Sequence, residues 1–343
     1  MINQQRSDHT ISPWFQAFFI GCTSLALAVM LYYNIQFFDA REPLPQLLPA
    51  TSELYKNISP APVRAGIYIR DLPEFDMLHG KLTTDLVLWF KYKPSQVSPE
   101  QLANFVFERA EIKSQSKPIV TSIGPDEALA TFELRLGFVM PLNFKDFPLD
   151  DHQLSLTIAN YTADASAINL ITDDSDIIIN PEIQTEGWFL FKKTATAGYT
   201  QDPISSKKGG TKTLHPRAIF SLDFERSGIR QVTTVFLPLL LIFLITLFSF
   251  SVEPQGSDFY NVIAMSTTSI LALIAYRFVI ETISPATGYF TLSDYMFIFF
   301  LLATTAILFI NALGDRVSRD QKKLITVALH AATIAFFVYL FVW

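Results

Sequence analysis

Five long stretches of this chain contain no Lys, Arg, Asp or Glu, and they limit what the chain can fold into. They cover residues 9–38, 231–252, 259–276, 295–314 and 324–343. Each has about 18 residues or more, which at 1.5 Å per residue spans a hydrocarbon layer of roughly 30 Å. A buried helix in a large soluble core could account for one such stretch, but not for four between residues 231 and 343. We therefore predict a four-helix transmembrane domain at 231–343.

The first apolar stretch is either a signal peptide that is removed or a signal anchor that is kept. Arg6 precedes the apolar run, and residues 26–28 (ALA) resemble a signal-peptidase site. The apolar run continues past that site through Val29–Tyr33, which is typical of an anchor. Both alternatives stay open, and both place the following segment outside. Residues 1–38 are therefore assigned as a signal peptide or signal-anchor helix.

Composition and charge exclude several classes of protein. Charged residues make up 17% of the chain, against about 25% in an average soluble protein, and 45 of the 58 lie in residues 39–230. The net charge of −6 argues against a nucleic-acid partner, because phosphate binding needs concentrated positive charge. The lone cysteine, Cys22, excludes a disulfide-stapled fold.

The basic residues predict the orientation in the membrane. The connection 315–323 holds four of the six Lys and Arg residues found outside residues 39–230. By the positive-inside rule this connection is cytoplasmic. Residues 39–230 and the C-terminus are then expected outside, in a multi-pass protein of the cell (inner) membrane with short cytoplasmic loops and a periplasmic β domain.

The sequence of the exported region, residues 39–230, predicts β structure. Residues 154–158 and 220–225 alternate apolar and polar side chains with period two. Further strand candidates are residues 66–70, 82–92, 131–138, 167–172 and 188–196. Strands do not alternate with helices, so we expect an antiparallel β-sandwich at 62–230, preceded by a Pro-rich linker at 39–61.

Side-chain groupings that would indicate an enzyme are missing. The five histidines are scattered, without the spacing of a metal site, and no phosphate-binding glycine loop is present. Residues 150–151 and 173–176 are rich in Asp and could bind a cation through oxygen ligands. Solvated turns are the favoured interpretation of both. We expect no catalytic residues, no metal and no cofactor.

The third apolar stretch differs from its neighbours by carrying four consecutive hydroxyl residues, 266–269. Steps of three and four residues along the expected helix 259–282 give one face, which runs from small and polar to bulky and apolar. This face consists of Asn261, Ala264, Thr268, Leu271, Ala275, Phe278 and Thr282. Such a face suits an ion pathway, with hydroxyls that replace ion hydration and apolar rings that gate by dewetting. Alternatively, the hydroxyls bond to backbone carbonyls or to another helix.

Several motifs in matching order resemble one family. Residues 144–154 (FKDFPLDDHQL) look like the F-P-F-D-x-Q signature of pentameric ligand-gated ion channels, in their prokaryotic branch without the loop disulfide. Residues 185–188 (TEGW) resemble the entry to the ninth strand, and Arg230 and Pro238 resemble residues at the first channel helix. Residues 281–289 (ETISPATGY) resemble the loop between the second and third channel helices of proton-gated members. The resemblance covers roughly residues 62–343.

The resemblance implies a homopentamer in which helix 259–282 of each subunit lines a central pore. Leu271 then falls at the hydrophobic gate and Thr268 at a hydroxyl ring below it. The family's coupling role falls on Asp150, Arg230, Pro285 and Tyr289, including an Asp150–Arg230 ion pair. A merely structural salt bridge between these two residues is the alternative.

Cation selectivity is a hypothesis that rests on rings of Asp258 and Glu281, which would lower the barrier for positive ions. The sequence departs from the family at the inner mouth, where residues 259–261 (FYN) stand in place of an acidic residue. The family's W-x-P loop, which forms part of the agonist pocket, is not recognisable between residues 89 and 147.

The agonist is therefore an unidentified small molecule or protons. Tyr161 and Tyr199 fall by position in loops that flank the family's agonist pocket, where they could form an aromatic cage or be ordinary surface tyrosines. Protons are suggested by the resemblance and by 25 acidic residues in 39–230. A membrane sensor or accessory subunit that binds a periplasmic solute without conducting ions is the alternative function.

Two ionisable residues fall within predicted membrane helices. We expect Arg277 near the outer end of its helix, turned from the pore axis toward a neighbouring helix or the interface, because a charge in lipid needs water or a partner. We expect His330 to be a hydrogen-bonded packing residue.

Overall fold

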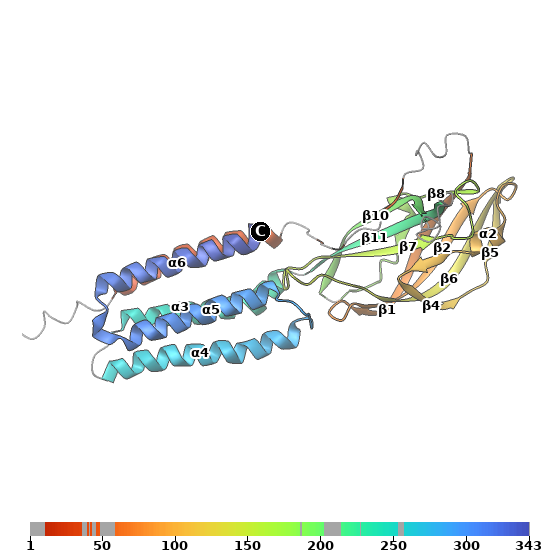
Figure 1. Cartoon of the computed structure of the whole chain (residues 1–343). Helices are drawn as coiled ribbons and strands as arrows, with labels where there is room; N and C mark the ends of the chain where they lie inside the picture. Colours follow the sequence, from red (N-terminus) through yellow and green to blue (C-terminus); the bar gives the residue numbers. More distant parts are fainter. Residues whose placement is uncertain are drawn as a thin grey trace, which may run out of the picture. The chain divides into compact units, whose positions relative to one another are not determined.

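The computed structural model describes residues 11–35, 40, 42, 46–48, 59–185, 187–201, 214–226, 228–252 and 257–342. The chain divides into two compact units, one of strands and one of helices (Figure 1). The sandwich unit comprises Asp39–Asn143 and Asp151–Arg226. The helical unit comprises Met1–Phe38, Phe144–Asp150 and Ser227–Trp343.

The sandwich unit is built from two sheets. The first has the order β4-β6-β2-β1-β8, with β5 also pairing with β6 and β9 with β1, and the second has the order β10-β11-β7-β3. The strands of the first sheet are β1 (Ala61–Asp76), β2 (Lys81–Tyr92), β4 (Ala110–Gln115), β5 (Ile119–Gly124), β6 (Glu127–Val139), β8 (Ile168–Ile171) and β9 (Ile177–Ile179). Those of the second are β3 (Val106–Glu108), β7 (His152–Ala159), β10 (Trp188–Gln201) and β11 (Leu214–Arg226), and a short helix α2 (Pro99–Ala103) precedes β3.

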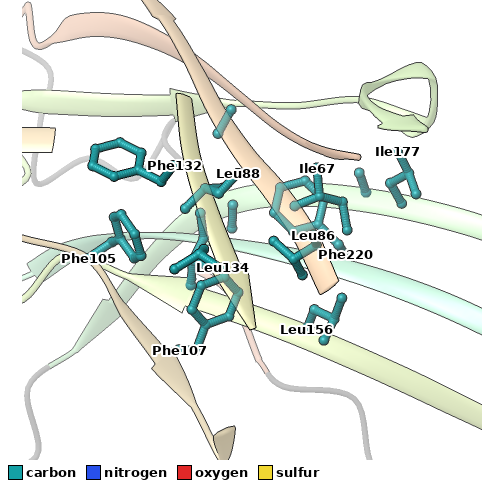
Figure 2. Packing of buried hydrophobic residues seen from close by; sticks show 14 of the residues in the cluster. Ile67, Leu86, Leu88, Phe105, Phe107, Phe132, Leu134, Leu156, Ile177 and Phe220 are labelled. Carbon is teal, nitrogen blue, oxygen red and sulfur yellow. The ribbon is translucent and has the colours of Figure 1, made fainter. Parts of the chain in front are cut away.

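Alternating apolar residues form the core between the two sheets. In β2, Leu86, Leu88 and Phe90 are at most 2% exposed, and they recur at every second position because successive side chains of a strand point to opposite faces. Figure 2 shows side chains from both sheets in one cluster, including Leu88, Phe132 and Phe220. All seven predicted strand segments lie in observed strands or overlap them, and several observed strands are longer.

The expected antiparallel arrangement is wrong for two short strands. β8 and β9 both run parallel to β1, at its residues 61–64 and 67–69 respectively. β8 follows β7 of the other sheet, so the chain crosses between sheets at residues 160–167 and arrives in the same direction as β1. The other paired strands are antiparallel.

The acidic segment 173–176 is a turn whose three aspartate carboxylates accept hydrogen bonds from other groups of the protein. Asp173 caps the 3₁₀ turn Asp174–Asp176, and Arg64 donates to both Asp173 and Asp176. Asp174 accepts a hydrogen bond from the backbone N of Ala195 at 2.8 Å. The turn interpretation is therefore confirmed here. Asp150 and Asp151, in contrast, are buried, so the solvated turn expected at 150–151 is wrong.

Parts of the segment predicted as a linker contact the sandwich. Ala40 forms an isolated bridge with Asp151, and Leu48 forms one with Tyr199. The backbone N of Leu48 donates to the carbonyl of Tyr199 at 2.9 Å, and the reverse bond has the same length. Backbone pairing of this kind is set by the neighbouring strand, so Pro-rich composition alone did not predict it.

Within the residues that the structure describes, the helical unit has five helices long and apolar enough to cross a membrane. They are α1 (Pro13–Ile35), α3 (Gly228–Phe248), α4 (Ser257–Ile283), α5 (Leu292–Ala312) and α6 (Arg319–Val342). α5 starts at a capping box, in which Thr291 and Asp294 bond to each other's backbone N–H groups. α5 packs against both α3 and α4, whereas α1 packs against α6 and α3.

Candidate functional site

The polar-to-apolar face predicted on α4 is exposed along its whole length in the single chain. We call it the α4 stripe; its members are Asn261, Ala264, Thr268, Leu271, Ala275, Phe278 and Thr282. Leu271 is 61% and Phe278 65% exposed. On the opposite side, Val262, Leu273 and Ile280 are at most 1% exposed, where α4 packs on α3 and α5. One face of α4 therefore packs against the other helices of the unit, and the opposite face is exposed in the single chain.

Most of the hydroxyls in the middle of α4 are bonded within the helix. Ser266, Thr267 and Ser269 each donate to the carbonyl four residues earlier, at 2.9–3.0 Å. Ser266 also accepts from the Nδ2 of Asn311 at 2.9 Å, which ties α4 to α5. The alternative of backbone-bonded hydroxyls is thus confirmed for these three residues. Thr268 is exposed on the α4 stripe.

Arg277 joins the end of α4 to the start of α5. Its Nη1 donates to the carboxylate of Asp294 in the capping box, and its Nε lies 3.3 Å from the Oε1 of Glu281. Its guanidinium also lies 5.7 Å from the ring centroid of Phe297. The expectation that Arg277 turns toward a neighbouring helix is confirmed. The side chain of Glu281 is 54% exposed, while that of Asp258 lies outside the described part of the chain.

An open cavity of about 640 Å³ lies beside this ion-pair cluster. It is lined by Arg277, Glu281, Asp294 and residues 284–290 of the α4–α5 connection. Pro285 is buried at its edge, and Tyr289 is 41% exposed. Two of the predicted coupling residues therefore lie on the same connection as the charge cluster.

The segment Phe144–Asp150, between β6 and β7 in sequence, belongs to the helical unit. The backbone N of Phe144 donates to the hydroxyl of Tyr289 at 2.9 Å. The N–H groups of Leu292 and Ser293, at the start of α5, donate to the carbonyls of Lys145 and Phe147 at 2.8 and 3.1 Å. The family-like motif is thus held through three hydrogen bonds, one to the α4–α5 connection and two to the first residues of α5.

The other two predicted coupling residues differ in environment. Asp150 is 1% exposed, whereas Arg230 is exposed in the first turn of α3. An ion pair between them stays a prediction.

The two tyrosines proposed for an agonist pocket have unlike surroundings. Tyr161 is 43% exposed in the loop after β7, and its hydroxyl donates to Glu108 at 2.8 Å. Tyr199 lies within β10 and is 2% exposed, so its placement in a surface loop is wrong. β10 extends to Gln201 because it pairs with β11 over its whole length, which carries Tyr199 into the sheet.

A buried histidine–carboxylate pair was missed by the sequence reasoning. His152 is fully buried, and its Nδ1 lies 2.7 Å from the Oε1 of Glu42. Glu42 also accepts from the backbone N–H groups of Asn143 and Gln153, each at 3.2 Å. The ring of His152 lies 5.2 Å from that of Trp188. His152 directly follows the motif aspartates, but Glu42 lies in the predicted linker, so no sequence signal joined them.

Three exposed or partly exposed aspartates of the sandwich unit have lowered pKa values. Hydrogen bonds from Arg135 at 2.6 and 2.5 Å lower the pKa of Asp85. Hydrogen bonds from Ser95 lower the pKa of Asp126, and those from Ser175, with Arg64, lower that of Asp173. Each of these groups therefore stays ionised to a lower pH than an ordinary aspartate. Among the residues that the structure describes, no group of three or more His, Cys, Asp or Glu side chains is placed to hold a metal ion.

Comparison with known proteins gives one distant relationship to a channel. No protein-family model matches the chain. A proton-gated ion channel of Gloeobacter violaceus is 22% identical over 186 residues, which are 54% of this chain and 49% of that protein. The chain thus aligns with about half of the relative's length. A β-rich unit followed by apolar helices fits this relationship. The chain has apolar helices typical of a membrane protein and is distantly related to a proton-gated ion channel. This relationship supports ion-channel function and points away from an enzyme.

Proposed function

We propose that this chain is one subunit of a homopentameric ion channel and that the α4 stripe lines its pore. The observation that carries the proposal is the exposure of all seven stripe residues on a helix that packs by its other face. An exposed polar side chain on this face, such as that of Thr268, is less stable against lipid than against water, because hydrocarbon offers no hydrogen bonds. An aqueous pathway shared by identical helices around a symmetry axis would hydrate such side chains.

The stripe also supplies a physical means of gating. Rings of Leu271, Ala275 and Phe278 would exclude water when the helices are close and admit it when they separate. The ring of Thr268 would offer hydroxyl oxygens to a partly dehydrated ion. We assign residues 231–343 as the pore domain and residues 62–230 as the extracellular ligand-binding domain, outside the inner membrane, with the C-terminus also outside.

Charge near the outer end of α4 favours cations in this proposal. Arg277 is paired with both Glu281 and Asp294, so each subunit carries one excess negative charge in this cluster. The half-exposed carboxylate of Glu281 is the one nearest to the stripe residue Thr282 in sequence. Symmetry repeats the charge in every subunit, and a ring at Asp258 would add to it at the other mouth.

We expect the purified protein to contain five subunits by native mass spectrometry and to give unitary currents in planar bilayers when the outer pH is lowered. The currents should reverse near the potassium or sodium potential. Glu281→Gln should lower the cation-to-anion permeability ratio roughly fivefold, since an interaction of about 1 kcal/mol corresponds to that factor. Glu127→Gln, a glutamate of the sandwich unit paired with Lys91 at 3.2 Å, is the matched control.

Reversal potentials that follow chloride would exclude cation selectivity. A complex of another subunit number would exclude the pentamer. If no condition gives unitary currents, the non-conducting sensor or accessory subunit becomes the better interpretation of the same fold.

The coupling of the sandwich to the pore is proposed to run through the segment Phe144–Asp150. Its three hydrogen bonds to Tyr289 and the start of α5 mean that a displacement of this segment would displace the connection that follows the pore helix. Pro285, in the same connection, limits the backbone freedom of the loop. Asp150 and Arg230 are proposed to act as a pair at this level.

Protons are the proposed trigger, with Glu42 and His152 as the sensing pair. An ordinary histidine titrates near pH 6.5, and protonation next to a carboxylate creates an ion pair. Asp85, Asp126 and Asp173 are poor sensors, because hydrogen bonds already hold their pKa values low. His152 precedes Gln153 in β7 and follows the Phe144–Asp150 segment closely, so a change there is transmitted over a short length of chain.

Glu42→Gln should change the pH of half-maximal activation, because it removes the carboxylate that lies 2.7 Å from the Nδ1 of His152. His152→Gln should abolish the response or shift it at least as far. The pair formed by His79 and Asp76 has the same 2.7 Å separation but is exposed, and His79→Gln is the control that should leave the activation pH unchanged. Activation curves of both sensor variants that coincide with the unmodified protein would refute this assignment.

A further inference from the structure

The N-terminal helix α1 is attached to the helical unit along one side. Gln16, Thr23 and Leu27 are at most 1% exposed and recur at helical spacing, and Ile11, just before the helix, is also 1% exposed. Trp14, Phe18 and Leu25 are at least 65% exposed on the other side. α1 is therefore apolar around its circumference, as a membrane helix is, yet it buries one defined face against its neighbours.

The start of α1 is bonded to the end of α3. The Nε2 of Gln16 donates to the carbonyl of Leu247 at 3.2 Å, and the backbone N of Ile11 donates to the carbonyl of Phe250 at 3.1 Å. Leu247 lies in the last turn of α3, where carbonyls have no partner within the helix. α1 thus supplies donors to groups that would otherwise lie unsatisfied in an apolar environment.

The middle of α1 is bonded to the middle of α6. The hydroxyl of Thr23 lies 2.8 Å from the Nδ1 of His330, and the ring of Phe19 stacks on the imidazole with centroids 5.8 Å apart. His330 is only 2% exposed. At 1.5 Å per residue, Thr23 and His330 each lie about 15 Å from the start of their helices, so this contact joins the middles of the two helices. Figure 1 shows α1 alongside α6.

The directions of α1, α3 and α6 are compatible with all three helices spanning the same bilayer. With the basic connection 315–323 in the cytoplasm, α6 runs from inside to outside and α3 from outside to inside. The start of α1 is bonded to the end of α3, against which it packs, so α1 is antiparallel to α3 and also runs from inside to outside, in the same direction as α6. A signal anchor that exports the β domain has this direction.

We infer that residues 13–35 are not removed after export and that α1 is a fifth membrane-spanning helix, docked on α6 and α3. Its Thr23 is the side-chain partner of His330, an otherwise costly polar group inside a membrane helix. Loss of α1 at the site after Ala28 would leave the His330 Nδ1 and the carbonyls of Leu247 and Phe250 facing lipid. This role is structural and does not depend on ion conduction.

The first test is the mass of the mature protein. The full chain with a C-terminal tag is purified from bacterial membranes, and its intact mass and N-terminal peptides are measured. We expect peptides from residues 1–28 to be present. A mature N-terminus at or near Val29 overturns the inference.

The second test asks whether α1 is seated as the contacts indicate. Thr23→Val should lower the Tm of the detergent-purified protein by about 2 °C, the size expected for one hydrogen bond between membrane helices. In a His330→Leu background the same change should have no further effect. Thr333→Val is the matched control, because its buried hydroxyl donates to the carbonyl of Leu329 within α6. Equal effects of Thr23→Val in both backgrounds, or no effect in either, overturn the docking.

Discussion

Replacing Leu271 with serine should leave the channel conducting under conditions that keep the unmodified protein closed. Leu271 is 61% exposed on the α4 stripe, and in the proposed pentamer five copies surround the axis at one level. A ring of leucines excludes water at short separation, whereas a ring of serines hydrogen-bonds to it and stays wet. We expect basal cation flux into proteoliposomes to rise at least tenfold, which needs a change of only about 1.4 kcal/mol in the closed–open equilibrium.

The matched control for this variant is Leu302→Ser. Leu302 is 65% exposed on α5, so the same change is made at a site of similar exposure off the proposed pore face. It should leave basal flux unchanged while the protein retains its subunit number. If both variants leak equally, the flux reports a damaged bilayer or fold. If neither leaks, Leu271 is not at the gate.

The membrane helices were predictable because their signal is local. A run of 18 or so residues without charge is visible in the sequence, and each such run became a helix with ends within several residues of the prediction. α4 continues past the end of its uncharged run at Tyr276 to Ile283, as the predicted helix 259–282 does, and its Arg277 pairs with two carboxylates, one of them on α5. The exposed stripe was also predictable, since helical periodicity places its members on one face.

Contacts between distant segments were not predictable. Glu42 and His152 are 110 positions apart, and the first lies in a segment whose composition indicates a linker. Tyr199 was expected in a loop from its position relative to the family's agonist pocket, but β10 continues to pair with β11 through Gln201. The parallel strands β8 and β9 depend on where a crossover lands, which no local pattern specifies. The hydroxyls at 266, 267 and 269 bond to the helix itself, an alternative that sequence alone could not separate from a pore role.

Breaking the ion pair between Arg277 and Asp294 should destabilise the helical unit more than any other single charge removal proposed here. Their side chains are only 28% and 11% exposed, and Asp294 also caps α5 by accepting from the backbone N of Thr291 at 2.7 Å. Arg277→Met would leave the carboxylate of Asp294 buried without its cation. We expect a loss of about 2–3 kcal/mol, or a fall of roughly 5–10 °C in Tm by thermal-shift fluorescence.

Adding Asp294→Asn to Arg277→Met should restore most of the lost stability, because the amide removes the buried charge while its oxygen can still accept the capping hydrogen bond. The exposed pair of Arg135 and Asp85 is the matched control, joined by two hydrogen bonds but with side chains 50% and 25% exposed. Arg135→Met should lower the Tm much less than Arg277→Met does, since water already screens that pair. The difference in stability loss between Arg277→Met and Arg135→Met would then come from burial of the first pair, since both pairs have short contacts. An equal fall in Tm for Arg277→Met and Arg135→Met would mean that water reaches Arg277. The ion-pair cluster of Arg277, Asp294 and Glu281 beside the proposed pore would then be solvated as well.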